Sequence, residues 1–244
     1  MLYLRRNYRE KSKSSGLLNK YQVREEESDL QIQTKGIYIK EAGQKLLEIR
    51  NSLSDYIKTN PLFLKSLTPI PPNSEMPWIA KTMAEASLAA GVGPMAAVAG
   101  AIAEGVGRHL EKLSSEVIIE NGSDVFFRMP SPLLIGIFAG ESPLSMRLGI
   151  RCHAPKGGGI CTSSSTVGHS LSGGRADAFV VLAESASLAD AAATAGGNFV
   201  KTKEDLAPSV EKILEIKGVR GALAILGPLL SAAGDIELEE LESI

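Results

Sequence analysis

The chain has few of the residues that stabilise small disulfide-rich proteins or bind nucleic acids. Its 244 residues include two cysteines, three histidines and one tryptophan. Two cysteines exclude a disulfide framework. A net charge of −2 gives no reason to expect nucleic-acid or membrane partners. With 44% hydrophobic and 22% charged residues, the composition instead predicts a globular protein with a substantial core.

Long apolar runs and export signals are also lacking. The start, MLYLRRNYREKSK, becomes charged before an apolar segment forms, so we expect no signal peptide. The Ala-rich stretch 83–106 contains Glu85 and Glu104, and its residues are too small to predict a membrane span. These observations favour a cytoplasmic protein. Of the two carboxylates, Glu104 is expected by default to be a solvated surface group.

Strand and helix patterns follow each other twice along the chain. We expect hairpins at 21–33 and 117–127, a helix at 40–58, and helix pairs at 78–90 with 94–112 and at 187–197 with 206–217. The Pro-rich passage 61–77 is expected to be an irregular connector, and the acidic stretch 230–244 a solvated edge or tail rather than a site. The order predicts one α+β domain, 1–244, with a flexible arm at 1–15 and two halves at 16–135 and 136–244.

A polar cluster interrupts the second half. Successive hydroxyl side chains are followed by an imidazole, in the order Thr162, Ser163, Ser164, Ser165, Thr166 and His169. Asp190 and Thr194 are four residues apart, so a helix places both on one face. Oxygen ligands at that spacing suit Mg²⁺ or Ca²⁺. The alternative is that Asp190 completes a helix cap with Ser187 while Thr194 packs.

The two cysteines flank a turn-forming sequence. Cys152 and Cys161 lie in two expected strands, and a tight turn at Lys156-Gly157 would place their thiols on one face of neighbouring strands. A thiol pair with His153 or Lys156 nearby would favour the thiolate. The alternative is that both cysteines are buried and behave as small hydrophobic residues.

Several of these segments resemble the ApbE superfamily of flavin transferases. Residues 187–195, SLADAAATA, are similar to its ADA…T element, and 161–164, CTSS, to its A-T-S-G strand. Residues 97–104 resemble its helix after K-G-x-A-V-D, and 120–124 its N-x-G-G-D/N turn, while His169 resembles the histidine before its D-P-x-T-G turn. The segments cover roughly residues 93 to 200 in family order, which is more specific than any one of them.

The resemblance implies a fold, a ligand and a metal. The fold would be T-fold-like, with duplicated units of antiparallel sheet and helix pair and the ligand between them. The ligand would be a small flavin- or nucleotide-type anion, FAD or FMN, with Mg²⁺ held by Asp190 and Thr194. His169 would serve as acid or base. The ligand contacts would come from Thr162, Ser163, Ser164, Ser165, Gly122 and Asp124. Flavin transfer itself is not implied, because Gly93-Pro94-Met95 replaces the family's K-G lysine segment.

Two other functions stay open. Relatives of this branch are associated with homocysteine biosynthesis and sulfur assimilation, so the chain could be an accessory protein that uses Cys152 and Cys161. It could also be a non-catalytic ApbE-like scaffold. Asp190→Ala would abolish Mg²⁺-dependent ligand binding under the first interpretation, and Cys161→Ser would impair only the sulfur function. The Ala- and Gly-rich helices leave room for a homodimer.

Overall fold

The computed structural model describes residues 18–164 and 173–241. The first half contains β1 (Asn19–Glu25), β2 (Ser28–Thr34), α1 (Ile39–Thr59), α2 (Pro61–Lys65), α3 (Trp78–Ala90), η2 (Pro94–Ala97), α4 (Val98–Leu110), β3 (Val117–Asn121) and β4 (Asp124–Arg128). The remainder contains β5 (Leu133–Gly136), β6 (Leu148–Cys152), β7 (Gly158–Ser163), β8 (Ala178–Ala183), α5 (Ala186–Phe199), η3 (Lys203–Asp205), α6 (Leu206–Leu214), β9 (Val219–Leu226), β10 (Leu229–Gly234) and β11 (Glu237–Glu240).

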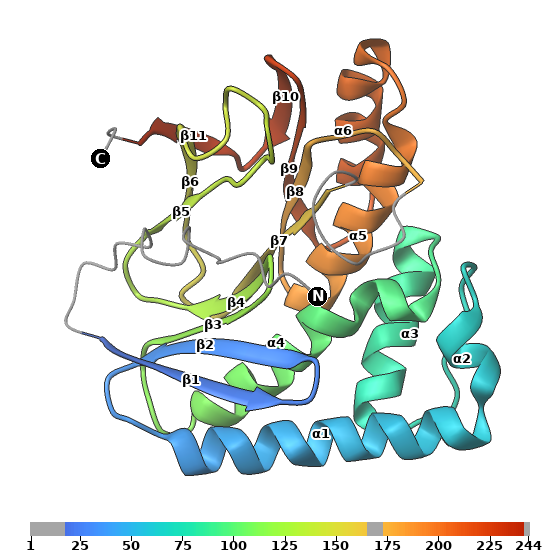
Figure 1. Ribbon diagram of the computed structural model, residues 1–244, viewed down its shortest axis with the longest axis vertical. Helices are drawn as coiled ribbons and strands as arrows, with labels where there is room; N and C mark the ends of the chain where they lie inside the picture. Colours follow the sequence, from blue (N-terminus) through green and yellow to red (C-terminus); the bar gives the residue numbers. More distant parts are fainter. Residues whose placement is uncertain (1–17, 165–172, 242–244) are drawn as a thin grey trace.

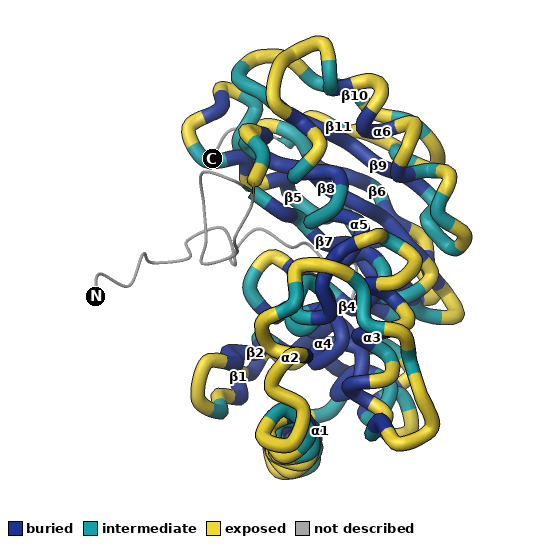
Figure 2. Tube along the Cα trace, turned by 90° about the vertical axis from the view of Figure 1, so that its right-hand side faces the viewer, coloured by how far each residue is buried: buried dark blue, intermediate teal, exposed yellow. Residues whose placement is uncertain are grey.

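The elements form three layers around an eight-stranded antiparallel sheet (Figure 1). Its strand order is β1-β2-β3-β4-β7-β8-β9-β10, and β11, β6 and β5 form a separate small sheet. Successive residues of a strand point to opposite faces. Phe126 therefore packs in the core shared with the helices, and Phe127 in the core shared with the small sheet. Figure 2 shows the central strands buried, as two-sided packing requires.

The α+β class predicted from the sequence is confirmed. Residues 19–128 and 158–234 each run through two strands, helices and two strands, while an internal duplication stays a prediction. One expectation was wrong. A short helix, α2, begins the Pro-rich passage, because Pro61 takes the first helical position, where proline is tolerated. The acidic tail contains β11, a largely exposed edge strand of the small sheet, in agreement with the expected solvated edge; its Glu237 and Glu239 form ion pairs with Arg151 of β6.

The helices α3 and α4 are rich in alanine and glycine. Their buried residues include Met83 of α3 and Val106 of α4, both in the core between helices and sheet. Within 18–164 and 173–241, no single helix has the length and apolar composition of a membrane span. Residues 78–90 and 94–110 together have the necessary length and composition, but they are bent by 103° at the break between them.

Close backbone approach fixes α5 between α4 and β7. A Cβ atom on Gly100 of α4 would lie 2.2 Å from the carbonyl oxygen of Ala186 and 2.8 Å from the Cβ of Asp190. A Cβ on Gly159 of β7 would lie 2.2 Å from the Cα of Ala186. The first turn of α5 can reach this position only because both neighbours lack side chains. These glycines therefore determine where Asp190 lies.

Gly100→Ala is expected to destabilise the fold, because the added methyl group meets backbone and a rigid Cβ rather than a flexible side chain. Overpacking of this kind costs about 1–3 kcal/mol or more of unfolding free energy. Gly43→Ala in α1 is the matched control. A Cβ there would be 3.8 Å from Val23, and the change should stabilise the helix by about 0.5–1 kcal/mol. Urea unfolding of the two variants measures the difference; equal effects would contradict the close approach.

Candidate functional site

Segments of both halves meet where α4 begins. β4 of the first half pairs with β7 of the second, with Asp124 opposite Cys161. Asn121, at the end of β3, donates a hydrogen bond from Nδ2 to the Ala99 carbonyl oxygen, 3.1 Å away. The Gly100 amide at the start of α4 donates to Asp190 Oδ2 of α5, 2.8 Å away. Carboxylates from both halves are thereby brought to one place.

The β3–β4 turn places Asp124 at this junction. Asn121 and Asp124 are paired across the turn, and Gly122 has a left-handed φ of +73°. Glycine favours that conformation because it has no Cβ, so the predicted Asn-Gly hairpin is confirmed. The Thr162 amide donates to the Ser123 carbonyl oxygen at 3.2 Å, which extends the contact between this turn and β7.

Asp124 is buried, with 8% of its surface exposed. Its Oδ1 atom is buried and accepts no hydrogen bond from the described part of the chain, and the same is true of Ser163 Oγ. Burial raises the pKa of Asp124 to about 7, although contacts from the Cys161 thiol and the Ser123 hydroxyl oppose the rise. Unpartnered polar atoms in a native interior are rare and commonly mark a place for a ligand, ion or water.

Asp190 is the second carboxyl group of the junction. The residue as a whole keeps intermediate exposure. Burial of the carboxyl, and then the nearby carboxyl of Asp124, raise the pKa of Asp190 well above its ordinary value, while hydrogen bonds from the Gly100 and Ala99 amides oppose the rise. Two enclosed carboxyls disfavour ionisation in each other, so a shared proton or a cation stabilises such a pair.

Each of the helices α4 and α5 supplies a carboxylate that accepts a hydrogen bond from the first turn of the other helix. Glu104 Oε2 of α4 accepts hydrogen bonds from the amide and the hydroxyl of Ser187 at 3.2 and 3.1 Å. Asp190 of α5 accepts in turn from Gly100. A negative group beside a helix N-terminus is favoured by the helix dipole. The reciprocal contacts therefore hold the two helices, and with them Asp190, in a fixed relation.

Two predictions about these helices were wrong. Glu104 is not a solvated surface carboxylate, since only 8% of it is exposed and it binds Ser187. The cap of α5 is Ser185, whose hydroxyl accepts from the Leu188 amide at 3.2 Å. The sequence offered one signal for Glu104. It lies one helical turn after Gly100, on the face where small residues predict a close neighbour.

A cation site is chemically consistent with this junction. Among the residues described here, no group of three His, Cys, Asp or Glu is arranged to hold a metal. Mg²⁺, however, accepts hydroxyl, carbonyl and water oxygens beside one or two carboxylates. Thr194 follows Asp190 by one turn of α5, as the sequence predicted, and Asp124 and Ser163 each have a buried oxygen without a partner in the described chain. These are oxygen groups of the kind that a hard cation accepts.

The predicted hydroxyl cluster is only partly gathered at the junction. In β7, Cys161 belongs to the helix-side core and Ile160 to the opposite core. Strand alternation puts Ser163 with Cys161 on the helix side and Thr162 on the other face. The Thr162 side chain thus points away from Ser163, and ligand binding by Thr162 stays a prediction. Ser164 follows β7 and is the last described residue before 173, while Ser165, Thr166 and His169 lie outside the described residues.

The expected pairing of the two cysteines was also wrong. Cys152 in β6 pairs with Leu133 of β5, in the small sheet, whereas Cys161 in β7 pairs with Asp124 and Val181. The turn residues between them connect two different sheets rather than a hairpin. The thiols occupy separate cores, Cys161 Sγ lying 3.3 Å from the Ala186 carbonyl oxygen. This arrangement gives no support to a thiol pair that handles sulfur.

Both thiols are expected to react slowly with a thiol reagent in the native protein. Burial raises the pKa of Cys152 to about 12 and that of Cys161 well above its ordinary value, and the thiolate is the reactive form. The measurement is the time course of modification by a colorimetric disulfide reagent, with and without denaturant. Two thiols should appear promptly only after unfolding. Rapid modification of either one in the native protein would contradict the burial.

The comparisons with known proteins identify the family. A family model described as AbpE bacteria matches residues 10–213. A UPF0280 protein of Methanococcus aeolicus is 42% identical over 205 residues, which cover 82% of this chain and 83% of the relative. A UPF0280 protein of Methanocaldococcus jannaschii is 39% identical over 213 residues, which cover 85% and 86%. The chain therefore belongs to this bacterial AbpE family and is a relative of the UPF0280 proteins.

Solved structures confirm the fold. The ApbE protein of Thermotoga maritima aligns with a TM-score of 0.56 and 14% identity, covering 88% of this chain and 96% of that one. The apo form of the flavinyl transferase ApbE of Pseudomonas stutzeri aligns with a TM-score of 0.57 and 13% identity, covering 91% and 94%. At this identity the likeness shows the shared fold alone. The resemblance stated from the sequence is confirmed for family and fold.

Proposed function

We propose that this protein binds a divalent cation with Asp190, Asp124 and Thr194, and with it the phosphate groups of a flavin- or nucleotide-type ligand. The observation that carries the proposal is the buried Oδ1 of Asp124, which accepts no hydrogen bond from the described residues and lies beside a second enclosed carboxyl. A cation would compensate both carboxylates. Mg²⁺ would supply the charge that joins carboxylates to phosphate oxygens.

The chain's own residues bind and orient the ligand in this proposal. The Ser163 hydroxyl, which is buried without a partner among the described residues, donates to the ligand. The β3–β4 turn at Gly122 brings backbone close to the same place. Glu104, through Ser187, keeps α5 and thus Asp190 in position. His169 is the proposed acid or base, on the resemblance of its sequence context alone.

Binding, rather than flavin transfer, is the proposed activity. The name of the Pseudomonas stutzeri structure, a flavinyl transferase, supports a flavin as the ligand to test first. Gly93-Pro94-Met95 stands where the superfamily has its lysine, and Pro94 begins η2 directly before α4. The chain thus lacks a positive side chain that the superfamily carries near the start of this helix.

The test is titration of the protein with FAD by calorimetry, in Mg²⁺ and in EDTA. Terbium luminescence reports on the cation alone. We expect FAD affinity to fall at least about tenfold without the cation, because the carboxylates then repel the phosphates. Asp190→Asn tests the proposed ligand directly, and Asp177→Asn is its matched control, since Asp177 also accepts a backbone hydrogen bond, from Gly227 at 2.7 Å. Absence of terbium binding, or FAD binding that ignores EDTA, would overturn the proposal.

A further inference from the structure

The two edges of the eight-stranded sheet differ in charge. β1, at one edge, has the sequence NKYQVRE and carries Lys20, Arg24 and Glu25. β10, at the other edge, has the sequence LLSAAG and carries no charged residue and no proline. Charged residues and proline are the usual means by which an edge strand is kept from pairing with another chain. β10 has neither.

The side chains of β10 are packed on both faces, while the backbone at its outer edge is not paired. Leu230 packs against the small-sheet core, and Ala233 against the helix-side core. β9 is the partner of β10 in the sheet, and within the described chain no other hydrogen bond involves residues 229–233. Ala232 is exposed. Such a row of edge amides and carbonyls is hydrated in the isolated chain and is a template on which another extended strand can pair.

We propose that β10 pairs antiparallel with β10 of a second copy of this chain, joining the two sheets about a two-fold axis. Such an axis places residues near the middle of β10 beside the same residues of the second chain. A charge on β10 would meet the same charge and repel it. The uncharged sequence LLSAAG suits this self-pairing, whereas a different protein partner would be selected by complementary charges, which β10 does not offer.

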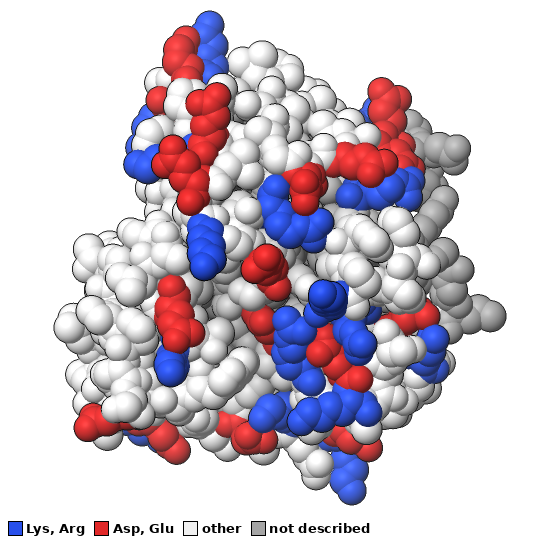
Figure 3. Space-filling view, turned by 180° about the vertical axis from the view of Figure 1, so that it is seen from behind, with Lys and Arg blue, Asp and Glu red and all other residues white. Residues whose placement is uncertain are grey.

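The surroundings of β10 are compatible with a second copy. α6 packs across β10, where Leu214 lies close to Gly234. Extending the sheet would bring the two copies of α6 nearer each other; α6 carries the exposed Glu211 and Lys212, which are of opposite sign, and Lys212 lies over the Phe199 ring of α5. Seen from behind, no charged side chain appears at the top of the molecule between α6 and the small sheet (Figure 3). On the face seen in Figure 3, this region therefore shows no like-charge cluster.

The experiment is light scattering of the full chain over a range of protein concentrations. We expect a mass of twice the 25.8 kDa monomer in the unmodified protein. Ala232→Lys places two lysines at the joint and should give the monomer, and Ala232→Glu should do the same. Ala89→Lys, at an exposed alanine of α3, is the matched control and should remain dimeric. A monomeric unmodified protein, or a dimer that survives Ala232→Lys, would overturn the proposal.

A mixing experiment shows whether a variant is monomeric because its β10 edges repel each other or because the variant is misfolded. The Ala232→Lys and Ala232→Glu variants, each monomeric, should form a mixed dimer when combined, because the opposite charges now face each other. Native mass spectrometry with one isotope-labelled variant detects this species directly. Hydrogen exchange of residues 229–234 should slow in the mixture. Failure to form a mixed dimer from two correctly folded variants would refute pairing through β10.

Discussion

Replacing Asp190 by asparagine is expected to abolish the proposed cation binding while leaving the fold intact. Asparagine keeps an oxygen that accepts the hydrogen bond from Gly100, which is 2.8 Å in the parent protein. It removes the negative charge that a cation requires. With one of two carboxylates lost, we expect the affinity for terbium or Mn²⁺ to fall at least about 100-fold. FAD affinity in Mg²⁺ should fall to its value in EDTA.

Luminescence titration and calorimetry measure these affinities, and a thermal melt reports on the fold. Thr194→Val is a graded companion, since it removes one proposed neutral ligand and should weaken binding less than Asp190→Asn does. Asp177→Asn, at a carboxylate that accepts a backbone amide elsewhere in the protein, should leave both affinities unchanged. If Asp190→Asn bound the cation as tightly as the parent protein, the site would have to lie elsewhere.

The stability of the cation-free protein is expected to fall as the pH rises from about 5 to about 7. The pKa of Asp124 is about 7 in the folded protein, because burial disfavours the charged form. The unfolded chain releases this proton near pH 4, so between these values the folded state binds more protons. The stabilisation from protonated Asp124 is therefore complete below about pH 4. Between about pH 4 and about pH 7, this one group lowers the free energy of unfolding by about 1.4 kcal/mol per pH unit. Asp190 acts in the same direction.

Urea unfolding in EDTA at several pH values measures this slope. Asp124→Asn should remove much of it, because its amide does not titrate. Asp205→Asn is the control. Hydrogen bonds from the Lys201 and Thr202 amides lower the pKa of Asp205, so that group is ionised in both states throughout this window and its loss should not change the slope. Stability that rises toward pH 7 in the parent protein would contradict an enclosed Asp124.

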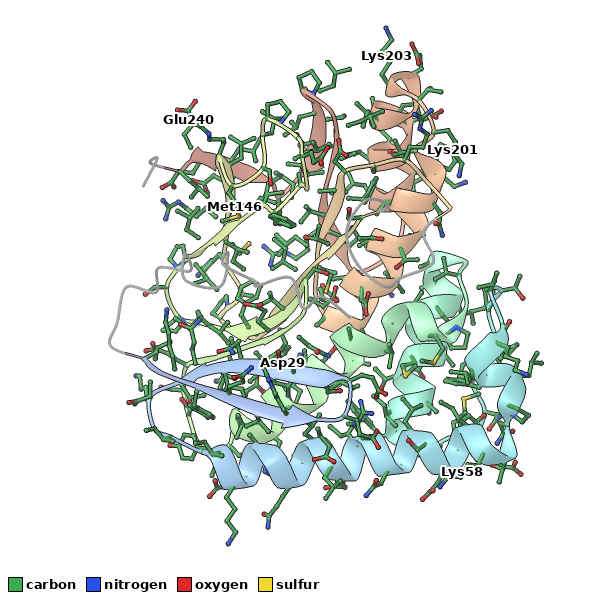
Figure 4. All side chains as sticks on the ribbon, in the orientation of Figure 1. Asp29, Lys58, Met146, Lys201, Lys203 and Glu240 are labelled. Carbon is green, nitrogen blue, oxygen red and sulfur yellow. The ribbon has the colours of Figure 1, made fainter. Side chains whose placement is uncertain are left out.

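Local contacts explain why some elements were predictable. The helix at 78–90 has the limits expected from its sequence, because Pro77 precedes its first turn and Gly91, with a φ of +72°, ends it. The hairpin around Gly122 follows from the conformational freedom of glycine. Just after α5, Lys201, which is labelled in Figure 4, donates to the Gly173 carbonyl oxygen, a contact between distant residues that no local pattern indicates.

The sequence by itself determined the family, the α+β class and the helix that carries Asp190 and Thr194, because strand alternation, helical periodicity and turn residues act over a few neighbouring positions. Only the tertiary structure decided that Asp124 lies near enough to Asp190 to raise its pKa, that Glu104 binds Ser187, and that Cys152 and Cys161 lie in different sheets. A strand's sequence determines which side chains share a face, but not which strand lies beside it. That choice depends on the packing of both cores at once.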